Sequence, residues 1–168
     1  MKEITYIAVG VAAMIAGGVV IFQLSLVVPI PGVKYILMAP YLSMVIYILL
    51  SKVKTNYALI KIGCVFGLIM MIMNLYMGLT IIATALLSQL SISPIQHQSK
   101  AFYGAVLFSA YAGICALVIS KYLVGGIFKE ISFLWLIATG LICAAFGIIG
   151  TILAKKIMKH LMKYSYEQ

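Results

Sequence analysis

The sequence predicts an all-α integral membrane protein with six transmembrane helices and with both termini in the cytoplasm. The 168-residue chain is 65% hydrophobic, 9% charged and has a mean hydropathy of +1.19. Soluble domains are roughly 45–50% apolar and about 25% charged, so this composition excludes them. The apolar residues form long runs, and about 20 apolar residues cross a bilayer as a helix. The lysines lie mostly between these runs, where they report topology.

Residues 1–168 are expected to form one membrane domain. The first helix covers residues 4–26 and ends before the proline-containing stretch 27–34, and the second covers 35–51 and ends before Lys52. Residues 57–90 are almost continuously apolar, too long for one span and short for two. Asn74, Tyr76 and Gly78 indicate a tight turn there, which gives helices at 57–73 and 79–90. A single tilted helix is the alternative. The last two helices are placed at 101–123 and 132–155.

The distribution of lysines favours six helices over five. The chain has no Arg, and with a cytoplasmic N-terminus nine lysines face inside and three outside. The inside set is Lys2, Lys52, Lys54, Lys61, Lys100, Lys155, Lys156, Lys159 and Lys163, and the outside set is Lys34, Lys121 and Lys129. With five helices, one of the two large inside groups would have to face outside. The tail at 155–163 (KKIMKHLMK) is expected to extend the last helix along the anionic inner membrane surface.

The residues needed for common catalytic chemistry are missing from the expected membrane interior. The chain has no Asp, its acids are Glu3, Glu130 and Glu167, and both His97 and His160 are expected outside the membrane. The three cysteines, Cys64, Cys115 and Cys143, have no paired spacing and are expected to be small buried side chains. There is no phosphate-binding loop for ATP hydrolysis. We therefore expect no enzyme activity, no cofactor and no metal site. The scattered lysines do not suggest a nucleic-acid partner either.

The expected outer end of the molecule gathers the candidate substrate-binding residues. Pro29 and Pro31 stiffen the first outer loop and Gly32 permits a turn, so this loop is interpreted either as a lid or as a simple connection. The candidates for contact with substrate are Lys34, Tyr35, Asn74, Tyr76, Lys121, Tyr122, Lys129, Glu130 and Trp135. Tyr and Trp at this level are also typical of a membrane-interface belt, and that alternative stays open.

Helix 1 carries small residues at four-residue spacing. Ala8, Ala12 and Ala16 lie on one face, with Ala13 and Gly17 one position round. In lipid, close approach of backbones across such stripes is a main source of helix association. The stripe therefore predicts a docking surface for another membrane protein.

Together these features resemble the substrate-binding S component of an energy-coupling factor (ECF) transporter, a micronutrient-uptake ABC importer. The family's Ala-x-x-x-Ala motif in helix 1 is matched by Ala8, Ala12 and Ala16. The stretch 28–40 (VPIPGVKYILMAP) resembles the family's passage from loop 1 into helix 2. The stretch 131–159 (ISFLWLIATGLICAAFGIIGTILAKKIMK) resembles its last helix with a Gly/Ala ladder and a basic end.

The resemblance implies a membrane-embedded binding subunit in the plasma membrane of a bacterium. Such a subunit binds a vitamin or related compound in an outward-facing site, then docks through helix 1 onto a T-type transmembrane subunit that carries two cytosolic ATPases. The lysines suit an anionic group and the aromatic rings a flat one, which allows a vitamin, a precursor or a tetrapyrrole-like compound. Two other interpretations stay open: an accessory membrane subunit without a small-molecule ligand, and a small homodimeric secondary transporter.

Overall fold

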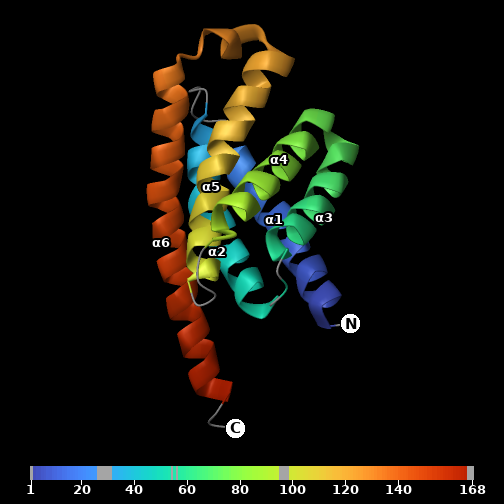
Figure 1. Ribbon diagram of the computed structural model, residues 1–168, viewed down its shortest axis with the longest axis vertical. Helices are drawn as coiled ribbons and strands as arrows, with labels where there is room; N and C mark the ends of the chain where they lie inside the picture. The colour runs from blue at the N-terminus through green and yellow to red at the C-terminus, as the bar shows by residue number, and fades with distance from the viewer. Residues whose placement is uncertain (1, 26–31, 54, 56, 95–98, 166–168) are drawn as a thin grey trace.

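The computed structural model is a bundle of helices that describes residues 2–25, 32–53, 55, 57–94 and 99–165 (Figure 1). Six α-helices and two short turns of helix occur within those ranges. They are α1 (Lys2–Ser25), α2 (Val33–Lys52), α3 (Ala58–Met73), α4 (Leu75–Ile92), α5 (Lys100–Ile119), the π-helical turn η1 (Ser120–Val124), the 3-10 turn η2 (Gly126–Glu130) and α6 (Phe133–Ser165). The described residues contain no strand, so the all-helical class is confirmed.

Five helices are long and apolar enough to cross a membrane. These are α1, α2, α4, α6 and the continuous stretch formed by α5 and η1. The remaining helix, α3, is apolar but has only 16 residues, a length of about 24 Å against a hydrocarbon core of roughly 30 Å. The composition and helix lengths are those of a multi-pass membrane protein.

The apolar stretch 57–90 forms two helices that are broken at one residue. Asn74 has extended backbone angles (φ −158°, ψ 117°), and α4 begins directly after it at Leu75. The single tilted helix considered for this stretch is therefore wrong. The second helix starts four residues before the expected position, because Gly78 is not part of the turn. Gly78 lies inside α4, where a Cβ would come within 2.6 Å of the Gly67 carbonyl on α3.

Helix α2 lies at the centre of the packing and contacts α1, α5 and α6, while the α3–α4 pair packs against α5 and touches α1 through α3. The main core joins five helices around fully buried side chains that include Met14, Ile46, Leu59, Ile62 and Phe108. Small residues allow the close crossings, since packing is the main force between helices in lipid. Gly63 meets Ala85 between α3 and α4, and Gly150 lies against Pro40 between α6 and α2.

Buried hydroxyl groups on α4 are satisfied by the helix itself. Thr84 and Ser88 donate to the carbonyls four residues earlier at 2.8 and 2.7 Å, and Ser91 shares a 2.9 Å hydrogen bond with Tyr111 on α5. Such pairing is needed where no water can replace it. Cys115 and Cys143 are buried between helices and Cys64 is half-buried, and all three are free thiols.

Candidate functional site

The candidate site is the end of the bundle where α2 and α6 begin and α5 ends. Gly32 precedes α2 with a φ of +97°, a conformation that favours glycine. A Cβ at this position would lie 3.6 Å from the Leu117 side chain and 3.7 Å from the indole nitrogen of Trp135. The turn residue expected from the sequence therefore brings α2 against the ends of α5 and α6.

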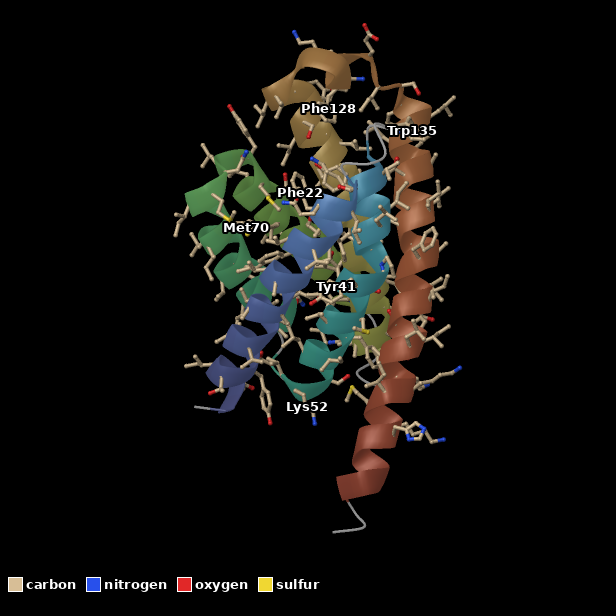
Figure 2. All side chains as sticks on the ribbon, turned by 180° about the vertical axis from the view of Figure 1, so that it is seen from behind. Phe22, Tyr41, Lys52, Met70, Phe128 and Trp135 are labelled. Carbon is tan, nitrogen blue, oxygen red and sulfur yellow. The ribbon has the colours of Figure 1, made fainter. Side chains whose placement is uncertain are left out.

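A small apolar cluster closes this end of the bundle. Leu117, Ile131 and Leu136 are buried, and Tyr35, Val118 and Phe128 pack against them. Figure 2 shows Phe128 and Trp135 at this end and Lys52 at the opposite end. Tyr35 is thus partly used for packing between α2, α5 and α6. Trp135 is 37% exposed, which leaves part of its ring available at the surface.

Lys34 is held between two aromatic rings. Its Nζ lies 5.0 Å from the centroid of the Tyr35 ring and 5.8 Å from that of Phe22, near the end of α1. Both distances fall within the range of a cation–π interaction. Phe22 is absent from the residues expected at the site. The signal that could have found it is its position near the C-terminal end of α1, which precedes the start of α2 by only a short stretch of sequence.

Lys121 is committed to the connection between α5 and α6. Its Nζ donates a 2.5 Å hydrogen bond to the Ile131 carbonyl, which ties η1 to the residues just before α6. Two consecutive glycines with positive φ, Gly125 and Gly126, make the sharp turn between η1 and η2. This bond satisfies a main-chain acceptor and holds the connection close to the bundle.

The other candidates of the α5–α6 connection lie at the surface. Tyr122 is 77% exposed, and Lys129 and Glu130 are also exposed. The connection that carries them lies at the same end of the bundle as the beginnings of α2 and α6 (Figure 1).

Asn74 and Tyr76 belong to a different part of the same end, the turn between α3 and α4. The Asn74 side-chain oxygen accepts hydrogen bonds from the amides of Tyr76 at 2.9 Å and Met77 at 3.3 Å. It is therefore the N-cap of α4, a role that explains an Asn at this position without any ligand. The Tyr76 carbonyl in turn accepts a 2.7 Å hydrogen bond from the Thr80 hydroxyl, so these side-chain hydrogen bonds lie within the first turns of α4.

The lid residues are only partly described. Pro29 and Pro31 lie outside the described residues, so only Gly32 of the expected lid can be placed. Gly32 is buried beside Leu117 and Trp135.

The docking residues expected on helix 1 are all exposed. Ala8, Ala12 and Ala16 face away from the bundle. The opposite side of α1 packs on α2, where Gly10 lies against Leu49 and Gly17 against Tyr41. Helix α1 thus has two small-residue faces, one used inside the molecule and one open.

Comparisons with known proteins give no further guidance, since no family model, curated protein or solved structure matches this chain.

Proposed function

We propose that this chain is the substrate-binding S component of an ECF-type ABC importer. In this role it captures a vitamin or related micronutrient outside the cell and delivers it through a T-type membrane subunit and two cytosolic ATPases. The proposal includes six membrane crossings, with α3 as the shortest, and cytoplasmic termini in the plasma membrane of a bacterium.

The exposed alanine stripe of α1 carries the proposal. Internal packing of α1 uses the face with Gly10 and Gly17, so Ala8, Ala12 and Ala16 are not needed to hold α1 in the bundle. A second face of small residues allows another helix to approach closely, and such contacts drive association in lipid. A T-type subunit is the partner that the resemblance gives to this face.

The end opposite the chain termini supports a binding role. Lys34 offers a positive charge beside the rings of Phe22 and Tyr35, and Trp135 exposes part of its ring nearby. A cation next to aromatic surface suits a flat compound with an anionic group. A vitamin, its precursor or a tetrapyrrole-like compound has this chemistry. The Lys121 bond to Ile131 keeps the α5–α6 connection over the same end.

Energy for transport comes from the partners in this proposal. The sequence lacks a phosphate-binding loop, and ATP hydrolysis is assigned to the two cytosolic ATPases.

The first test is native mass spectrometry of the purified chain, combined with absorption spectroscopy and without added ligand. A small molecule that is released on denaturation supports the binding role and identifies the class of compound. A ligand-free chain that brings down a membrane partner other than a T-type subunit with its ATPases would instead support an accessory subunit. Ion-coupled uptake by the chain alone in vesicles would support a secondary transporter.

The second test addresses docking. A12L/A16L places bulk on the stripe, and A145L makes the same kind of substitution at an exposed alanine of α6, outside α1. Each variant is co-expressed with the T-type subunit and ATPases of the source organism and purified through a tag on the chain. We expect A12L/A16L to keep its ligand and lose the partners, and A145L to keep both. Full assembly of A12L/A16L would show that the stripe is not the docking surface.

A further inference from the structure

The last helix is much longer than the bundle that it belongs to. Helix α6 has 33 residues, a length of about 50 Å, whereas the hydrocarbon core of a bilayer is roughly 30 Å thick. Ala154 is its last described residue that is fully buried. The following part of α6 extends below the other helices (Figure 1). This end of α6 therefore leaves the hydrocarbon region on the side of the chain termini.

The register of α6 separates a packing face from a lipid face. Gly147, Gly150 and Ala154 are buried, and their spacing of three and four residues keeps them on the side that meets α2 and α5. Ile148 and Ile152 are exposed and four residues apart, on the opposite side. In a membrane that side contacts lipid.

The lipid face of α6 carries isoleucines along the bundle and lysines where the helix extends beyond the bundle. At about 100° per residue, Lys155, Lys156 and Lys159 lie within an arc of about 100° that includes the direction of Ile152. All three are exposed, and α6 contains no acidic residue that could neutralise them. Apolar side chains in lipid are thus followed directly by ammonium groups at the level of the headgroups.

We propose that Lys155, Lys156 and Lys159 form a binding surface for the headgroups of anionic phospholipids. The lysine stems extend along the acyl-chain boundary and the charged ends reach the phosphates, the arrangement known as snorkelling. Each Lys near an anionic membrane surface contributes about 1 kcal/mol, a factor of about 5 in affinity. Three such contacts on one side of a helix favour phosphatidylglycerol over a zwitterionic lipid. This surface is independent of the proposed transport function.

The test is a titration of short-chain phosphatidylglycerol into the full-length protein in detergent, followed by native mass spectrometry. The variant K155Q/K156Q/K159Q removes the surface. Its matched control, K52Q/K61Q/K129Q, removes the same charge from three other exposed lysines. We expect the α6 variant to bind phosphatidylglycerol roughly 125-fold more weakly than wild type, the product of about 5-fold for each of the three lysines. The control keeps at least most of the wild-type affinity.

Further measurements test whether binding depends on the positive charge and on the acyl chains of the lipid. K155R/K156R/K159R should restore binding, because charge is kept, and short-chain phosphatidylcholine should bind all variants equally weakly. Equal affinity of the α6 variant and the control for phosphatidylglycerol would overturn the proposal. Tight binding of glycerol phosphate without acyl chains would also overturn it, since the surface would then be a site for a soluble phosphate compound.

Discussion

The Tyr41 hydroxyl on α2 donates a 2.6 Å hydrogen bond to the main-chain carbonyl of Ala13 on α1. Ala13 lies one helical turn before Gly17, so its carbonyl is also an acceptor within α1. The Tyr41 phenol therefore adds a second bond to an acceptor with two lone pairs. Gly17 makes the approach possible, because a Cβ there would overlap the Tyr41 ring. The pair sets the distance between α1 and α2, and with it the position of the alanine stripe on the other side of α1.

Replacing Gly17 by Ala should push α1 away from α2. The added methyl group meets a rigid aromatic ring, and overpacking of this kind costs about 1–3 kcal/mol. The measurement is the unfolding free energy in a titration with denaturing detergent, followed by Trp135 fluorescence. Gly18→Ala is the control, because its Cβ would meet only the flexible end of Met38 at 3.2 Å. Equal losses for the two variants would contradict this account of the α1–α2 contact.

Removing only the hydrogen bond should have a smaller effect. Tyr41→Phe keeps the ring against Gly17 and deletes the donor to the Ala13 carbonyl. Hydrogen bonds between membrane helices contribute about 0.6 kcal/mol on average, and we expect a loss of that size in the same titration. A loss greater than that of Gly17→Ala would mean that the bond, not the packing, holds α1 in place.

The crossing of α2 and α6 depends on Gly150. A Cβ at this position would overlap the Pro40 carbonyl and the Ser43 hydroxyl, and the carbonyl is main chain that cannot rotate away. Gly150→Ala should therefore destabilise the protein by about 3 kcal/mol, at the upper end of typical overpacking. Gly140→Ala, on the same helix, would meet the side chain of Ile114 and should cost clearly less, because that side chain can shift. Thermal unfolding of the two variants in one detergent compares them.

Much of the helical arrangement follows from the length of the apolar runs, but its details do not. The break at Asn74 is visible in the sequence as a polar residue inside an apolar stretch. Gly78 looks equally like a turn residue, yet it lies within α4 and faces the Gly67 carbonyl. A glycine in a turn and a glycine that allows a neighbouring helix to pack closely look the same in a sequence. Only the packing partner separates the two.

The candidate site shows the same limit. Charge and aromatic content marked Lys34, Tyr35 and Trp135, and these lie at one end of the bundle. The sequence does not predict which polar groups already bond to other parts of the protein, because that depends on how the segments pack. Lys121 binds the Ile131 carbonyl and Asn74 caps α4, while Phe22 approaches Lys34 from a helix that was expected only to dock.

Two variants of Asn74 can distinguish a structural role of this residue from a ligand-binding role. Asn74→Ala removes the acceptor for the amides of Tyr76 and Met77 and should cost about 1 kcal/mol of stability. Asn74→Ser keeps an N-cap oxygen and should restore most of that loss. Unfolding in detergent measures the stability, and the native mass spectrum of each variant measures retained ligand. If Asn74→Ser is as stable as wild type but has lost a ligand that wild type retains, Asn74 contacts the substrate as well.

The orientation of the bundle can be tested with two lysines at its opposite ends. Lys52 ends α2 and Lys129 lies in η2, next to Phe128 at the far end of the molecule (Figure 2). Both are exposed, whereas Cys115 and Cys143 are buried and Cys64 is half-buried, so the unmodified chain serves as the background. The excess of lysines at the Lys52 end predicts that this end is cytoplasmic. In intact cells a membrane-impermeant maleimide should label K129C and not K52C, and it should label both after permeabilisation. Labelling of K52C alone in intact cells would invert the topology and place the Lys34 site in the cytoplasm.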